Sequence, residues 1–169
     1  SGIDLVATYN MDWSGGNTIL SAAGNWNSTK IKDRVDRDPG AGVKYFINDE
    51  SKYDNENGNP EYRMNLSMRH TMNNDVTVSV RGNLYGPYKN ANNSTLARIQ
   101  EYGRVTQWDT DVSWDLSEAY RLTLGINNVF DTMPDIDTVG ESCCGRTYRS
   151  GSVQDWQGTY YYVRGQISF

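Results

Sequence analysis

The residues of this chain that are capable of chemistry are few, and they lie far apart in the sequence. Cys143 and Cys144 are adjacent, and the single histidine is His70. Because His70 falls at the end of a predicted strand and both cysteines fall in a long connection, no Ser/His/Asp or Cys/His catalytic arrangement is predicted. Two adjacent thiols with one distant imidazole are also poor zinc ligands. An even cysteine count instead favours an oxidised pair, formed either between these neighbours or with cysteines elsewhere.

Carboxylates gather in two places. Asp109, Asp111 and Asp115 share one segment, but a strand face turned to water explains them better than paired acid–base catalysis. The other group crowds the first long connection: Asp33, Asp36, Asp38, Asp49, Glu50, Asp54 and Glu56. Oxygen ligands of this kind suit calcium, although no helix–loop calcium spacing is present. We expect a solvated loop, no enzyme activity and no cofactor, with a loop-bound Ca²⁺ as the alternative.

Aromatic and basic side chains in the long connections are the predicted ligand contacts. Loops carry most binding residues, and aromatic faces suit sugars or metal chelates. The predicted residues are Tyr88, Arg98, Tyr102, Arg146, Tyr148 and Trp156.

The elements that must position these residues are strands, because apolar and polar residues alternate in stretches of about ten. Seven strands are predicted, at 2–13, 18–31, 61–71, 76–87, 104–116, 121–130 and 158–169. Short connections at 14–17, 72–75 and 117–120 alternate with long ones at 32–60, 88–103 and 131–157. An up-and-down membrane barrel with short periplasmic turns and long outside loops produces this order directly, whereas a Greek-key sandwich does not. The first strand then runs inward, and Ser1 lies outside the cell.

The two predicted faces of these strands differ in charge. One face carries residues such as Leu5, Trp13, Met68 and Val163 and no full charge, while Asp, Arg and Asn side chains occupy the other. A soluble sheet with one buried face gives the same alternation, but strands of 10–13 residues match the hydrocarbon layer better than the soluble average of about 5 to 6. Aromatic residues near the strand ends indicate interfacial girdles.

Three motifs add a resemblance to a known family. Residues 159–169 (TYYYVRGQISF) are similar to the carboxy-terminal signal of bacterial outer-membrane proteins, with Phe169 last, Tyr161 eight residues earlier, and Val163 and Ile167 on the same face. Residues 122–131 (LTLGINNVFD) resemble the penultimate strand of TonB-dependent receptors, and residues 2–5 (GIDL) resemble strand starts in the same barrels. The fold implied is all-β: an antiparallel up-and-down transmembrane β-barrel, of which residues 1–169 are about seven C-terminal strands.

The resemblance implies a part of an outer-membrane import receptor for a scarce nutrient such as a metal chelate, vitamin or glycan. Such receptors have about 22 strands and a plugged lumen, so the implied partners are the remaining strands, the plug domain, TonB–ExbB–ExbD acting through that plug, the barrel assembly machinery and outer-membrane lipid. No plug or TonB-interaction segment is recognised in these 169 residues. We therefore expect a separately encoded, cleaved or otherwise partial chain, and Ser1-Gly2 without a leader fits a removed signal peptide or an internal piece.

Composition and charge narrow the possible partners and function classes. A net charge of -5 and a pI of about 4.8 argue against nucleic acid as a partner. No stretch approaches the roughly 20 apolar residues of a spanning helix. The mean hydropathy of -0.73 is also compatible with a barrel, because the value averages the apolar face and the polar face of each barrel strand. A porin-like structural or passive-pore subunit is the main alternative, and a soluble, secreted β-rich binding protein is the less favoured one.

Overall fold

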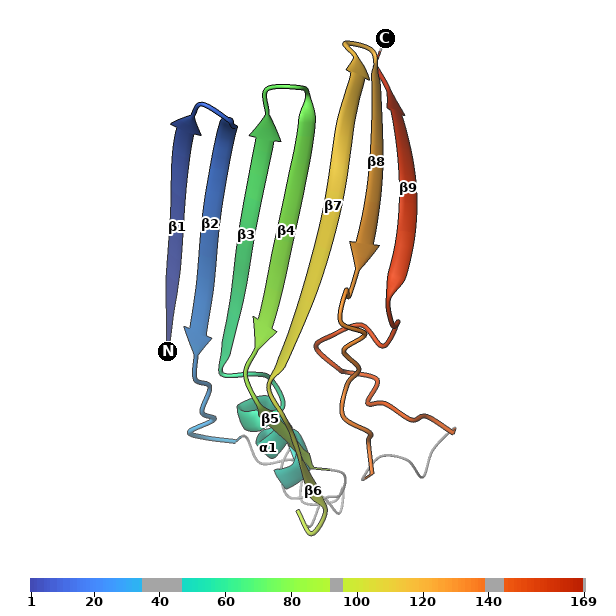
Figure 1. Cartoon of the computed structure of the whole chain (residues 1–169). Helices are drawn as coiled ribbons and strands as arrows, with labels where there is room; N and C mark the ends of the chain where they lie inside the picture. Colours follow the sequence, from blue (N-terminus) through green and yellow to red (C-terminus); the bar gives the residue numbers. More distant parts are fainter. Residues whose placement is uncertain (35–46, 92–95, 139–144, 169) are drawn as a thin grey trace.

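The computed structural model describes residues 1–34, 47–91, 96–138 and 145–168. Its main feature is one open antiparallel sheet of seven strands, with β1 and β9 at the two edges (Figure 1). The strands, in their order across the sheet, are β1 (Gly2–Trp13), β2 (Gly16–Asn27), β3 (Tyr62–Met72), β4 (Val76–Tyr85), β7 (Val105–Ser117), β8 (Tyr120–Asn127) and β9 (Tyr160–Ile167). The predicted all-β class and seven sheet strands are confirmed.

Short and long connections lie at opposite ends of the sheet. The three tight turns join β1 to β2, β3 to β4 and β7 to β8 at one end, and the long connections join the others at the end where Ser1 lies (Figure 1). Gly16 has φ 135°, and a Cβ there would lie 2.0 Å from the Thr71 carbonyl oxygen, so the first turn requires glycine. We call these two ends of the sheet, where the strands begin and finish, the turn end and the loop end.

Four predicted strands are shorter than the sequence indicated. β2 ends at Asn27 rather than at residue 31, and β8 ends at Asn127 rather than at residue 130. β4 ends at Tyr85 rather than at residue 87, and β9 begins at Tyr160 rather than at residue 158 and ends at Ile167. The physical reason at β8 is backbone conformation, because Asn128 and Asp131 adopt φ of 51° and 53°, a left-handed geometry that extended strands do not contain.

The long connections contain regular structure that the sequence pattern did not reveal. They hold a helix, α1 (Asp49–Asn57), and a hairpin of β5 (Tyr88–Ala91) with β6 (Ile99–Tyr102). The Asn48 side chain caps α1 by accepting from the Ser51 backbone N–H at 2.7 Å, and Asp49 and Glu50 occupy its first turn, where the helix dipole favours acids. The helix has no buried residue, which explains why no apolar periodicity marked it. No helix in the described ranges has the length and apolar character needed to cross a bilayer.

The small apolar core lies in the loops and not on the sheet. Among the described residues, the buried hydrophobic side chains are Tyr88, Ala91 and Tyr102, all in the β5–β6 hairpin. The strands of the seven-stranded sheet bury no aliphatic or aromatic side chain within the described ranges. Both faces of the sheet are therefore surfaces of this chain.

Candidate functional site

The strand register divides the sheet into an apolar face and a polar face. Residues paired across antiparallel strands share a face, so one row can be followed across all seven strands: Tyr9, Leu20, Met68, Val80, Thr110, Ile126 and Tyr161. Successive alternate rows place no Asp, Glu, Lys or Arg on this face of the paired strands. The two-face pattern predicted from the sequence is confirmed.

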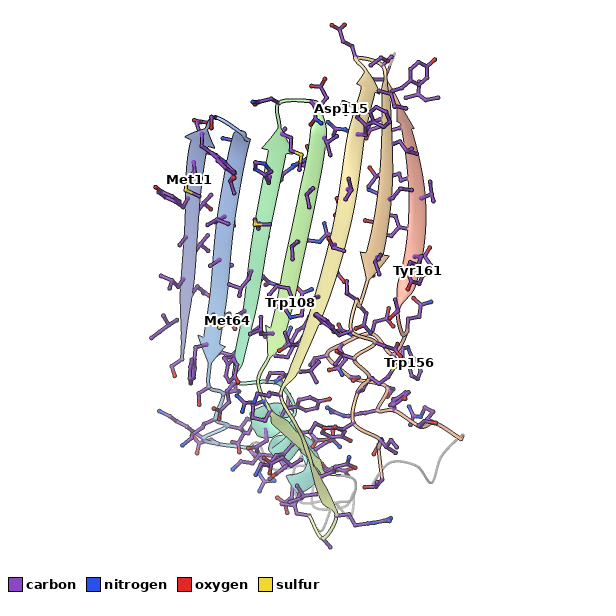
Figure 2. All side chains as sticks on the ribbon, viewed as in Figure 1. Met11, Met64, Trp108, Asp115, Trp156 and Tyr161 are labelled. Atoms are coloured by element: carbon purple, nitrogen blue, oxygen red, sulfur yellow. The ribbon has the colours of Figure 1, made fainter. Side chains whose placement is uncertain are left out.

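The apolar face has large side chains that no described part of the chain covers. Ile3 is 74% exposed, Tyr161 and Val163 are each 71% exposed, and Trp114 is 52% exposed. Figure 2 shows Met11 on β1 and Tyr161 on β9 at opposite edges of the sheet. An uncharged surface spanning seven strands exceeds the scattered apolar residues of ordinary soluble surfaces.

Aromatic rings pack against each other near both ends of the apolar face. At the loop end, the Trp26 and Tyr62 ring centroids are 5.4 Å apart. At the turn end, Trp13 and His70 are 5.3 Å apart, and Thr18 connects them. The Trp13 Nε1–H donates to Thr18 Oγ1 at 3.0 Å, and Thr18 Oγ1 is 2.9 Å from His70 Nδ1. His70 thus has a structural role beside a tryptophan, far from the loops.

Neighbouring strands on the polar face are linked by side-chain pairs, which account for the three aspartates of β7. Asp111 pairs with Arg81 at 3.1 Å, and Asp115 accepts two hydrogen bonds from the guanidinium of Arg121. Asp109 accepts from the backbone N–H of Asn128 at 2.9 Å. Each aspartate has its own partner, and Figure 2 shows Asp115 at the turn end, away from the loops. The arrangement is that of a polar surface cross-linked by charged pairs and not of a pair of catalytic carboxylates.

At the loop end, α1, the β5–β6 hairpin and the described residues of 128–157 form what we call the loop platform. Its centre is a stack of Tyr88 and Tyr102, with centroids 4.7 Å apart and side chains only 6% and 3% exposed. The Arg149 guanidinium lies 5.5 Å from the Tyr88 ring centroid and 5.9 Å from that of Tyr102, and it donates to the Gly58 carbonyl oxygen at 3.2 Å. Burial raises the pKa of the Tyr102 phenol, and the nearby Asp137 carboxylate adds to the rise.

Further hydrogen bonds join the three connections of the platform. The Gln100 amide donates to Ile136 O at 2.7 Å and accepts from the backbone of Thr138 at 2.8 Å. Asp135 accepts from the Gly103 N–H at 2.7 Å, and Asp54 of α1 accepts from the Ala91 N–H at 2.8 Å. The loop platform is therefore one connected unit.

The structure brings some predicted ligand contacts together and separates others. Tyr148 and Trp156 meet edge to face, 6.4 Å apart, and Trp156, which is labelled in Figure 2, is 53% exposed. Arg98 and Arg146 are exposed on the platform surface. Tyr88 and Tyr102 instead lie inside the platform, where they pack against Arg149. Ligand contact by any of these residues stays a prediction.

Sequence reasoning missed Arg149 and Asp137, the charged residues next to the stacked tyrosines. Nothing in their local sequence distinguishes them, because their partners lie far away along the chain: Tyr102 is 35 residues from Asp137, and Tyr102 and Gly58 are 47 and 91 residues from Arg149. Arg149 lies in a loop, two residues after a threonine, and no alternation of apolar and polar residues marks its position. Only the packing of the third long connection against the hairpin identifies the pair.

Several predicted sites fall partly or wholly outside the described residues. Cys143, Cys144 and Phe169 lie outside them, as do Asp36 and Asp38. Of the other acids in the first connection, Asp49 pairs with Arg34 at 2.6 Å and Glu56 accepts from the Ile31 N–H at 2.7 Å. Within the described ranges, no three His, Cys, Asp or Glu side chains are grouped as metal ligands would be.

Comparison with known proteins identifies a distant structural likeness. No family profile matches the chain, and no curated protein matches its sequence. Its structure is similar to a crystal structure of a mutant of the ferric enterobactin receptor from Pseudomonas aeruginosa, with a TM-score of 0.52 and 14% sequence identity. The match covers 99% of this chain and 31% of the receptor, so the chain spans about a third of that protein's length. At this identity the likeness concerns the fold.

Proposed function

We propose that this chain is the carboxy-terminal, seven-strand part of a TonB-dependent outer-membrane receptor that imports a scarce nutrient. The observation that carries the proposal is the apolar face, which is uncharged across seven strands and uncovered by the rest of the described chain. In this proposal the apolar face contacts lipid, the polar face lines the barrel interior, and the loop platform lies outside the cell. The protein carries out no catalytic step.

The spacing of the aromatic rings supports a bilayer as the neighbour of the apolar face. In β1, Ile3 pairs with Trp26 at the loop end, and Trp13 lies ten residues further along. At about 3.3 Å per residue this is roughly 33 Å along the strand. A barrel strand tilted by about 40° then covers about 25 Å along the membrane normal, which matches the height of the apolar band in outer-membrane barrels.

The slant of the register supports a barrel. Tyr62, near the loop end of β3, lies in the row of Ile3, whereas Tyr161, the first apolar-face residue of β9, lies in the row of Tyr9. The paired region thus moves along the strand direction from one edge of the sheet to the other. Barrel closure needs such a stagger, which accompanies the tilt of the strands.

The partners follow from the open edges of the sheet. β1 and β9 each have one strand neighbour among the described residues, and unpaired backbone groups in hydrocarbon cost several kcal/mol each. Further strands of the same receptor therefore pair with both edges, and a plug domain that contacts TonB fills the interior. The structural neighbour, a ferric enterobactin receptor, supports this assignment and makes a metal chelate one candidate cargo.

The test uses the complete gene product that contains this chain, expressed in a Gram-negative host. We expect it in the outer-membrane fraction, resistant to extraction by urea or carbonate and solubilised by detergent. In planar bilayers it should be closed to ions, and uptake of its nutrient should stop when the proton-motive force is collapsed. A permanently open pore would favour the porin-like alternative, and a protein soluble without detergent would refute the membrane assignment.

A further inference from the structure

A polar pocket lies at the loop end of the polar face, between α1 and the adjoining ends of β2 and β3. Its volume is about 290 Å³, near the lower end of the roughly 300–1,000 Å³ of small-molecule sites. The side chains used in the argument below are Asn27, Asn55, Glu56, Asn59, Glu61 and Arg63. The pocket is separate from the Tyr148–Trp156 pair.

The pocket has hydrogen-bonding capacity that the described residues do not use. Asn27 donates to the Asn25 side chain at 2.9 Å and Asn55 donates to Ser51 O at 2.7 Å, so both side-chain carbonyl oxygens remain as acceptors. The Asn59 amide and the Arg63 guanidinium have no hydrogen-bond partner within the described ranges. Glu56 uses one oxygen for the Ile31 N–H and retains the other. Unused donors and acceptors therefore both line one small space.

The wall formed by α1 is held in place before any ligand arrives. The Gly58 N–H donates to Asp54 O at 2.7 Å, and the Gly58 carbonyl accepts from Arg149 of the third connection. A Cβ at Gly58 would lie 2.4 Å from Asp54 O, and Pro60, two residues later, is fully buried. Fixed walls reduce the ordering cost of binding.

We propose that this pocket binds a neutral, polyhydroxylated ligand, such as one sugar residue of an oligosaccharide, and that this is the cargo class of the receptor. Each sugar hydroxyl both donates and accepts, which matches the mixture of amides, one guanidinium and carboxylates in the lining. An anionic metal chelate would instead meet Glu56 and Glu61 against the single cation Arg63. The inference rests on the proposed transport function, which supplies a reason for an outward-facing ligand site.

The experiment measures binding of the detergent-purified complete receptor to an array of neutral oligosaccharides, followed by calorimetry with the oligosaccharide that binds. Arg63→Gln removes the charge and most of the N–H donors of the guanidinium, and Asn59→Leu removes both amide donors. Both side chains are exposed, and we expect each variant to weaken binding about tenfold or more. Arg69→Gln is the matched control, because Arg69 lies on the same strand and face but does not line the pocket. It should leave the affinity within about twofold of the parent.

The inference is overturned if no neutral oligosaccharide binds, or if the Arg63 and Asn59 variants bind as tightly as the parent. These failures are distinguishable from failure of the proposed function. A receptor that sits in the outer membrane and transports another nutrient normally in both variants would leave the transport proposal standing. A protein absent from the outer membrane would remove both.

Discussion

The lipid contact of the apolar face can be tested with two neighbouring residues of β1. Val6 pairs with Ala23 on the polar face and Ala7 pairs with Ala22 on the apolar face. Both side chains are exposed, Val6 to 75%, so an arginine at either position meets no packed side chain of the described residues. Val6→Arg and Ala7→Arg therefore introduce the same charge into the same strand, on opposite faces.

The expected cost follows from depth in the membrane. Ala7 lies four residues from Ile3, or about 13 Å along the strand and about 10 Å along the membrane normal at a tilt of about 40°. This is near the middle of a band about 25 Å high, where a lipid-facing arginine costs about 2–4 kcal/mol. Val6→Arg should stay within about 0.5 kcal/mol, because it faces the hydrated interior near Asp4.

The assay is the free energy of unfolding in urea of the complete receptor reconstituted in vesicles, with the boiling-dependent gel mobility of folded barrels as the measure of assembly. Ala7→Leu serves as the control for side-chain size and should be neutral or stabilising. Equal destabilisation by the two arginines, or a negligible effect of Ala7→Arg, would refute the assignment of the apolar face to lipid.

Three further predictions concern the loop platform and one strand pair. Arg149→Met should loosen the β5–β6 hairpin by about 1–3 kcal/mol, seen as faster amide hydrogen exchange there, whereas Arg146→Met in the same connection should not. Burial raises the pKa of Tyr102, so the neutral phenol stabilises the folded state; this contribution is fully present below the ordinary pKa of about 10 and is lost as pH rises towards the raised value. Tyr102→Phe should remove one late-titrating phenol from the alkaline absorbance curve. Gly82→Ala should cost about 1–3 kcal/mol and alter tryptophan fluorescence, because its Cβ would lie 2.8 Å from the Trp108 ring.

The sequence by itself determined the strands, the turns and the chemistry of the two faces. Period-two alternation is a local property, so β1 and β3 were located to within one residue, and the alternation of short and long connections followed from turn residues. Once neighbouring strands are paired, the rows of residues that share a face, such as the row from Tyr9 to Tyr161, follow from this alternation. The errors in the predicted strand ends came from local backbone conformation, as at β8, where Asn128 in a left-handed conformation ends the strand early.

Only the tertiary structure decided the organisation of the loops. α1 is stabilised by its cap and has no buried face, so no periodic signal predicted it. Tyr88 and Tyr102 were predicted as ligand contacts, but both are buried beneath the guanidinium of Arg149, which is 61 and 47 residues away in the sequence. The polar pocket likewise requires α1 to be anchored over β2 and β3 by the other two connections. Such contacts join segments whose separation along the chain has no fixed period, and alternation within a strand carries no information about them.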